Sequence, residues 1–311
     1  MATNPIPASE PADDLEWTEL ALRGWGLYQR RGGLRFSIDA VLLAHFVQGC
    51  ERAQILDACT GTGVVAFILA ARFPQAKIEG IDIQPQLIAA ASASRARNGI
   101  PAEQLRFDVC DMRVKDRARG FGIDEKTCAG GAVIPSKMVQ TLGGALLSQT
   151  EINQRDALLT RIQSRGYDQV MEETAYTWFN RFIALRYMQE HNLLPVSVRV
   201  LPDASGALPE LVRQAQNVEL DGVDFSHVVE LLEGNRTETL YTELLIALCN
   251  QLSDVLPQMF EPISDYTELL FPDGLLREDS VLAMLAAVDA ENWTDIQVIG
   301  WLYQYYISQK H

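Results

Sequence analysis

The clearest chemical pattern in this sequence is a set of glycines and acids that follow short apolar segments. Gly61 and Gly63 stand after one such segment, in the stretch DACTGTG, where the absence of a Cβ lets the backbone bend and approach a ligand closely. Asp82 ends a second segment about 20 residues later, where a carboxylate can hold ribose hydroxyls. Asp111 ends a third, where a carboxylate can accept a hydrogen bond from an exocyclic amine such as that of adenine. The pattern predicts a site for an adenosine-containing cofactor.

Three apolar segments alternate with two Ala-rich stretches that are long enough for helices. The expected strands lie in AQILDACTG, AKIEGIDIQ and QLRFDVCDM, and the expected helices in VVAFILAARF and PQLIAAASASRARNG. This order predicts parallel strands joined by right-handed crossovers. We therefore expect an α/β N-terminal part with a partial Rossmann-like sheet, whose ligand site lies at the carboxyl ends of the strands.

The turn DACTGTG resembles the first motif of class I S-adenosylmethionine (SAM) methyltransferases, with Cys59 where that motif usually has its first glycine. The preceding stretch LYQRRGGLRFSIDAVLLAHFV is similar to the region before the first strand in bacterial tRNA(Val) adenine-N6 methyltransferases. The resemblance covers roughly residues 24–114. It implies SAM as the cofactor, with the Arg-Phe-Ser-x-Asp segment at 35–39 closing over it. The cofactor-binding residues that it implies are Arg35, Asp39, Asp57, Thr60, Gly61, Gly63, Asp82 and Asp111.

Two simpler interpretations stay open beside this one. The glycine turn can be a structural connection between a strand and a helix that holds no ligand. Residues 38–47 can form an ordinary amphipathic helix that packs on the sheet. The agreement of three motifs in order and spacing favours the cofactor site over the first of these, and the second is compatible with it.

The formal net charge of −15 is unevenly distributed. Residues 1–117 carry 13 Lys and Arg against 14 Asp and Glu, whereas residues 118–311 carry 13 against 27. The acidic second part is a poor candidate for a broad phosphate-binding surface. The basic stretch RVKDRAR at 113–119 stays open as a local basic patch, and its charge pattern favours solvated surface. The spacing of the five cysteines and four histidines indicates no metal site and a cytoplasmic protein. No apolar run reaches the length needed to span a membrane.

The last two thirds of the sequence predict mostly helices, separated by polar connectors that contain proline. The stretch MEETAYTWFNRFIALRYMQE carries a wide apolar stripe that includes Trp178 and Phe182. Because these aromatics are not regularly interleaved with basic residues, we expect them in a core rather than stacked on nucleic-acid bases. The best exceptions are Asn180 and Arg181 beside Trp178, because polar groups on an otherwise apolar helix need partners. Two further helices are expected, after an Asn235-x-x-Glu238 capping box and after a Thr294 cap.

A second resemblance covers roughly residues 118–310. The stretches EETAYTWFNRFIALRYMQEHNLLP, DYTELLFPDGLL and IGWLYQYYISQK are similar to the N-terminal helical region of PglX, the adenine-specific DNA methyltransferase of BREX phage-defence systems. We therefore expect a composite chain, with a disordered lead-in over 1–19, a partial SAM-binding domain over 20–117 and a mostly α-helical PglX-like region over 118–311.

Adenine-N6 methyltransferases hold the target amine with an Asn/Asp-Pro-Pro-aromatic loop, and this sequence contains no Asn-Pro-Pro, Asp-Pro-Pro or Ser-Pro-Pro. The catalytic residues are thus unknown, and we expect an incomplete standalone catalyst, because losing the groups that position a nucleophile costs orders of magnitude in rate. The resemblances imply a SAM-dependent adenine-N6 methyltransferase, or a component of one, acting on DNA in phage defence through additional subunits or a missing domain. The alternatives are a tRNA adenine-N6 methyltransferase, a non-catalytic module that binds other phage-defence proteins, and a truncated gene product.

Overall fold

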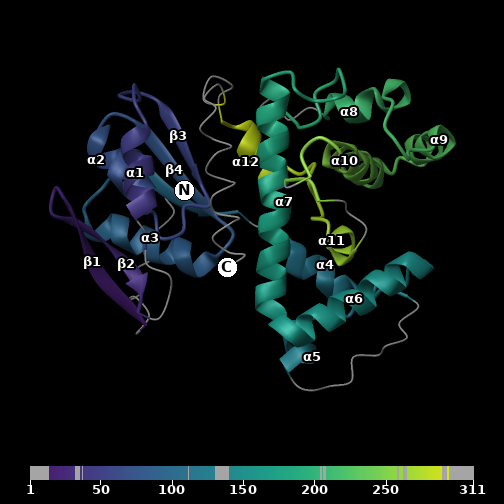
Figure 1. Ribbon diagram of the computed structural model, residues 1–311, viewed down its shortest axis with the longest axis horizontal. Helices are drawn as coiled ribbons and strands as arrows, with labels where there is room; N and C mark the ends of the chain where they lie inside the picture. Colours follow the sequence, from purple (N-terminus) through teal and green to yellow (C-terminus); the bar gives the residue numbers. More distant parts are fainter. Residues whose placement is uncertain are drawn as a thin grey trace, which may run out of the picture. The chain divides into compact units, whose positions relative to one another are not determined.

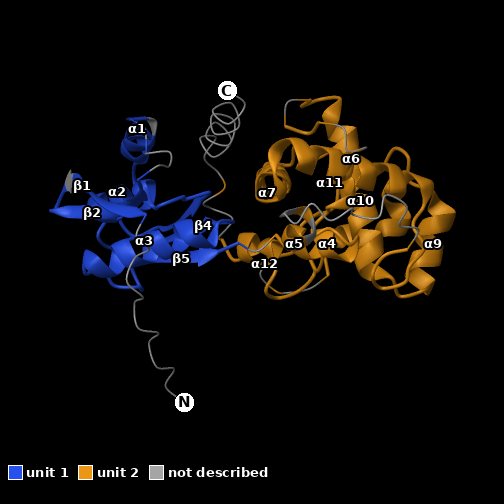
Figure 2. Cartoon of the chain, turned by 90° about the horizontal axis from the view of Figure 1, so that it is seen from below, with its two compact units in different colours: residues 1–110 blue, residues 111–311 orange. Residues whose placement is uncertain are grey.

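The computed structural model describes residues 14–31, 36, 38–110, 112–129, 140–203, 205, 208–257, 259–261, 265–288 and 293. The chain divides into two compact units, residues 1–110 and residues 111–311 (Figure 2). The first unit is an α/β unit with a parallel sheet, and the second is helical (Figure 1). The fold class expected from the sequence is confirmed.

The first unit begins with an antiparallel hairpin of β1 (Leu15–Leu22) and β2 (Trp25–Arg30). Residues 15–19 therefore belong to a strand, and the prediction of a disordered lead-in up to residue 19 is wrong for them. Aromatic packing explains the difference, because the rings of Trp17 and Tyr28 meet edge to face at 5.0 Å and the Arg97 guanidinium lies 4.0 Å above the Trp17 ring. The strand was not predicted because acidic residues alternate with apolar ones in β1, a composition that also suits a disordered segment.

The sheet of the first unit has three parallel strands in the order β3–β4–β5. These strands are β3 (Gln54–Ala58), β4 (Lys77–Asp82) and β5 (Leu105–Val109), and the helices α1 (Ile38–Phe46), α2 (Val64–Arg72) and α3 (Pro85–Arg97) accompany them. Each lies where the sequence predicts it. The register pairs Asp57 with Gly80 and Asp82 with Val109, so the carboxyl ends of the strands are aligned at one edge.

The second unit is built around α7 (Tyr167–Glu190), the long helix in teal that Figure 1 shows in full. Helices α4, α5, α6 and α12 pack against it. Trp178, Phe179 and Phe182 of α7 are fully buried, which confirms that its aromatic stripe is core. The helices around α7 are α4 (Val114–Gly120), α5 (Glu125–Ala129), α6 (Gln149–Arg165), α8 (Glu210–Arg213), α9 (Phe225–Glu233), α10 (Thr237–Ser253), α11 (Tyr266–Leu269) and α12 (Val281–Ala286), with a short 3-10 turn at Ala215–Asn217.

The start of α10 differs from the expected capping box. The helix begins at Thr237 with Arg236 at the N-cap and no side-chain cap. Asn235 adopts a left-handed conformation (φ +52°), and its N–H donates to the carbonyl of Leu232, so it ends α9 instead of starting α10. The Glu238 carboxylate accepts a hydrogen bond from the backbone N–H of Leu276 instead. The box is thus a sequence coincidence at a tight connection between two helices.

The basic stretch 113–119 belongs to the second unit, because α4 packs on α7. The boundary between the units therefore falls after residue 110, and the predicted boundary after residue 117 places α4 in the wrong unit. Each of the four cations in the stretch faces a carboxylate. The pairs are Arg113–Asp279 (2.7 Å), Lys115–Asp168 (2.7 Å), Arg117–Asp273 (3.4 Å) and Arg119–Asp116.

Some sequence predictions fall outside the described residues. These are the helix after the Thr294 cap and the positions of Arg35, Ser37 and Asp111. Among the helices that the structure describes, none has both the length and the apolar character needed to cross a bilayer.

Candidate cofactor site

The candidate site is the turn between β3 and α2. Its backbone enters the left-handed region at Cys59 (φ +58°), Gly61 (φ +57°) and Gly63 (φ +88°). The turn is fixed to the sheet because the N–H of Thr60 donates to the carbonyl of Ile81 at 3.0 Å, and it closes on itself through Gly63 N–H and the Thr60 carbonyl at 2.9 Å. The turn therefore has a defined shape at the carboxyl ends of β3 and β4.

Asp57, near the end of β3, ties this turn to the start of α2. Its Oδ2 accepts hydrogen bonds from the Thr60 hydroxyl at 2.6 Å and from the backbone N–H of Ala66 at 3.2 Å. The second bond serves as a helix cap, since Gly63 at the N-cap has no side chain to offer. Both of these hydrogen bonds use Oδ2 of the carboxylate.

Burial raises the pKa of Asp57 to about 6 from its ordinary value of 3.8. The bonds from Thr60 and Ala66 act in the opposite direction, and the nearby carboxylate of Asp82 adds to the rise. The cause is general, because a low-dielectric environment disfavours the charged form of an acid. A cation placed beside the two acids would relieve this cost and restore the ionised form.

Asp82, at the end of β4, is 2% exposed and holds two backbone groups. Its Oδ2 accepts from the N–H of Gly61 and its Oδ1 from the N–H of Gln84, both at 2.9 Å. Asp82 thus sets the position of Gly61 as well as standing where a ribose is expected.

The two glycines of the turn differ in what surrounds them. A Cβ placed on Gly61 would meet nothing within 4 Å, so open space lies beside its Cα. A Cβ on Gly63 would lie 2.7 Å from the ring of Phe107 and 3.1 Å from that of Phe67. Gly61 is therefore the point where a ligand can approach the backbone, and Gly63 is required for core packing beneath the turn.

Cys59 is an L-residue in a conformation that favours glycine, at the position where the resembling motif has one. Burial raises the pKa of its thiol well above the ordinary value, with further contributions from Asp82, Cys110 and Asp57. The thiol therefore stays protonated and contributes no charge to the site.

The structure brings together the predicted residues Asp57, Thr60, Gly61, Gly63 and Asp82 around one turn. Arg35 and Asp111 lie outside the described residues, and Asp39 belongs to α1, with its side chain likewise not described. Phe36, in the segment expected to close over the cofactor, packs against the core cluster of the first unit.

Sequence reasoning missed Phe107 and Gly80, which support the turn from below. A Cβ on Gly80 would meet Phe107 at 2.6 Å and the Thr60 hydroxyl at 2.8 Å. A larger residue at this position of β4 would therefore collide with the turn and with the ring beneath it. A glycine inside an otherwise apolar strand is the one signal that could have revealed it, because such a glycine marks a close approach of another group.

Comparisons with known proteins identify the class of domain that contains this turn. Residues 55–121 match the family model described as "Methyltransferase domain". The α/β unit and its glycine turn thus carry the features of a methyltransferase domain, and the resemblance read from the sequence is confirmed.

The chain is 40% identical over 161 residues to "Adenine-specific methyltransferase BrxX" of Escherichia coli O9:H4. The aligned residues make up 50% of this chain and 13% of that protein. It is 30% identical over 219 residues to "Adenine-specific methyltransferase PglX" of Lacticaseibacillus casei, and the alignment covers 63% of this chain and 18% of that protein. It is 43% identical over 60 residues to the "tRNA1(Val) (adenine(37)-N6)-methyltransferase" of Vibrio parahaemolyticus, and the alignment covers 19% of this chain and 25% of that protein. The matched part of the chain spans a quarter or less of the length of each of these relatives.

Proposed function

We propose that the first unit binds SAM and that the chain acts as part of a SAM-dependent adenine-N6 methyltransferase, with DNA as the substrate in BREX-type phage defence. The observation that carries the proposal is Gly61, which has open space at its Cα in a turn that hydrogen bonds tie to the carboxylates of Asp57 and Asp82. The match to a methyltransferase domain and the similarity to two adenine-specific methyltransferases support it. A cytoplasmic location, where SAM and the genome are both present, belongs to the same proposal.

The residues present fit such a cofactor. When bound, SAM supplies an electrophilic methyl group on a sulfonium centre. The backbone at Gly61 would lie against the methionine part, because no side chain blocks that approach. Asp57 Oδ1 would accept from its ammonium group, and Asp82 would hold the ribose hydroxyls.

The chain is proposed to need a further polypeptide or domain for methyl transfer. Its sequence contains no Asn/Asp-Pro-Pro or Ser-Pro-Pro segment, and the sheet of the first unit has three parallel strands within the described residues. Positioning of the target amine would come from that additional part, together with contacts to DNA. Other phage-defence proteins are the proposed source.

Calorimetry with SAM tests the cofactor site. We expect saturable binding, weakened about tenfold or more by Asp82→Asn, because the variant removes one acceptor and the charge that holds the turn. The matched control is Asp108→Asn, an acid on β5 that pairs with the exposed Arg106 at 3.0 Å. The absence of heat at millimolar SAM, or equal binding by the Asp82 variant, would rule out the cofactor site.

A second candidate substrate is tRNA, favoured by the 43% identity to the Vibrio enzyme over 60 residues. Transfer of a labelled methyl group from SAM to duplex DNA or to tRNA separates the two, with the chain assayed alone and together with co-purified defence proteins. Label in DNA only in the presence of partners supports the proposal. Label in tRNA from the chain alone would replace it with the second candidate.

A further inference from the structure

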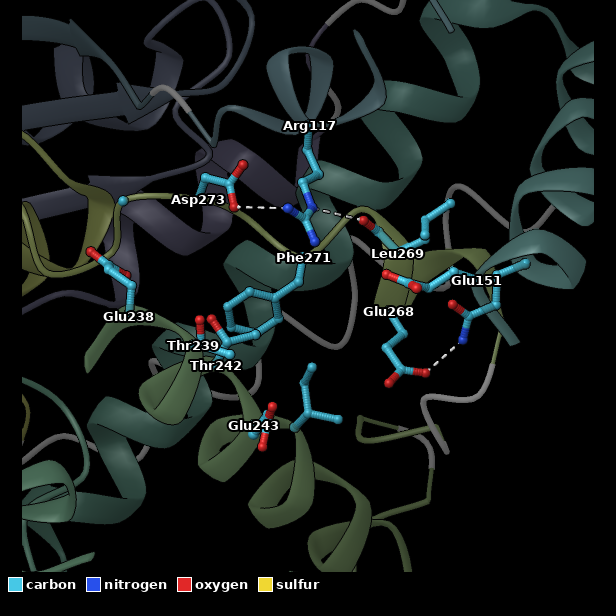
Figure 3. A pocket seen from close by; sticks show the side chains of 13 residues that line it. Arg117, Glu151, Glu238, Thr239, Thr242, Glu243, Glu268, Leu269, Phe271 and Asp273 are labelled. Carbon is cyan, nitrogen blue, oxygen red and sulfur yellow. Dashed lines mark hydrogen bonds and ion pairs between the residues drawn. The ribbon is translucent and has the colours of Figure 1, made fainter. Parts of the chain in front are cut away.

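A pocket of about 520 Å³ lies wholly within the second unit. Residues from α4, α6, α10 and the segment 268–274 line it (Figure 3). Its size falls in the range of small-molecule sites, which is roughly 300–1,000 Å³. Nothing in the proposed methyltransferase function uses it.

The floor of the pocket is apolar. Leu269 and Phe271 are buried, and Ile246 of α10 adds a third apolar side chain. The ring of Phe271 packs edge to face on Trp178 of α7 with 4.5 Å between ring centroids. An aliphatic chain that lies on this floor would bury its apolar surface away from water, which favours binding.

The rim of the pocket is acidic. Five carboxylates line it, and Figure 3 shows them on more than one wall: Glu151, Glu238, Glu243, Glu268 and Asp273. Arg117 is the one cation in the lining that the structure describes, and it is already engaged, because it lies 3.4 Å from Asp273 and donates to the carbonyl of Leu269 at 3.1 Å. The lining thus carries an excess of about four negative charges.

Neighbouring groups hold these carboxylates in place. Glu268 accepts from the amide of Gln154 at 2.6 Å, and Gln154 is a polar side chain only 5% exposed that reaches the pocket from α6. Glu151 accepts from the backbone N–H of Ser148 at 2.7 Å in a capping box. A site whose charges are fixed before binding loses less entropy when a ligand arrives.

A metal ion does not account for the arrangement. Within the described residues, no three His, Cys, Asp or Glu side chains converge closely enough to hold one. The carboxylates are instead spread around the pocket, with the hydroxyl-bearing Thr239 and Thr242 on α10 between two of them. Separated anions above an apolar floor match separated cations on an aliphatic chain.

We propose that this pocket binds an aliphatic polyamine, that is, two or more ammonium groups joined by methylene chains. The ammonium groups would pair with Glu268 and Glu151 on one side and with Glu243 of α10 on the other, and the methylenes would cover Phe271 and Leu269. The carboxylate of Glu243 also lies 3.2 Å from Nε2 of His227, so an ammonium group there would share this carboxylate with the imidazole. The same chemistry can come from a free polyamine or from neighbouring lysine side chains of a polypeptide.

Calorimetry on the full chain tests this with spermidine and, separately, with an acetylated tri-lysine amide. We expect one saturable site for spermidine, weakened about fivefold or more by Glu243→Gln and by Glu268→Gln, since each removes one charge at contact distance. The Glu268 variant keeps an oxygen that can accept from Gln154, so its fold is retained. Glu125→Gln, at an exposed position of α5 outside the pocket, makes the same change in net charge and should leave the affinity unchanged.

The outcomes are distinct. Saturable spermidine binding that is lost in the two pocket variants and kept in the Glu125 variant supports the proposal. Tighter binding of the tri-lysine amide, with the same variant pattern, assigns the ammonium groups to a partner's lysines. No saturable binding of either probe, or equal weakening by all three variants, overturns it, because the second result shows only attraction to an acidic surface.

Discussion

Replacing Gly61 by alanine should separate cofactor binding from folding. The new methyl group meets no atom of the chain within 4 Å, so the stability cost is only that of an L-residue at φ +57°, about 1 kcal/mol. The same methyl group fills the open side of the turn, where the ligand is expected. We therefore expect SAM affinity to fall at least tenfold, which corresponds to about 1.4 kcal/mol or more.

Two matched glycines make the comparison sharp. Gly99 also has a positive φ (+68°) and open space at its Cβ, so Gly99→Ala carries the same backbone cost away from the site and should bind SAM normally. Gly63→Ala drives a methyl group to 2.7 Å from Phe107, so it should lower the free energy of unfolding by about 2–4 kcal/mol through overpacking and backbone strain.

The measurements are calorimetric titration with SAM and urea unfolding for all three variants. The reasoning is refuted if Gly61→Ala binds SAM as tightly as the natural chain, or if Gly99→Ala loses affinity to the same extent. Unchanged stability in Gly63→Ala would show that the Phe107 contact does not constrain the turn.

Three further predictions concern the same turn. Thr60→Val removes the hydroxyl that donates to Asp57 at 2.6 Å and should cost about 1–3 kcal/mol in urea unfolding, whereas an unchanged midpoint would contradict a structural role for this bond. The folded-state pKa of Asp57 is about 6, above its ordinary 3.8, so the folded chain binds more protons than the unfolded chain between these pH values. The free energy of unfolding should therefore fall by up to about 3 kcal/mol as pH rises through that window, and Asp57→Asn should abolish this fall. Cys59→Gly relieves an L-residue at φ +58° and should stabilise the chain by about 0.5 kcal/mol; a lower unfolding midpoint would show that the thiol's packing outweighs the strain.

The sequence was sufficient to predict the sheet of the first unit, because its strands and helices have strong periodic patterns and short connections. It also located the turn, since the two glycines directly follow a strand. It could not distinguish the roles of Gly61 and Gly63. That difference depends on Phe107, which contacts the turn only after β5 has joined the sheet.

The hydrogen bonds of the site's carboxylates could not be predicted from the sequence either. Asp82 was predicted as a ribose ligand from its place at a strand end, but its two bonds to the N–H groups of Gly61 and Gln84 depend on how the turn folds back over β4. The missed hairpin has a similar origin, because the backbone of β2 is anchored on α3 through Ser94 and Asn98, residues about 70 positions away. Contacts at such separations leave no local periodicity to read.

The paired charges of the stretch 113–119 have a consequence for salt dependence. Because each of its four cations already faces a carboxylate, a phosphate group binding there would first displace an acidic side chain and would gain no counterion release. This stretch should therefore add almost nothing to the slope of log K against log salt for a complex with DNA. Most of that slope is expected to come from lysines and arginines of other polypeptides in the complex.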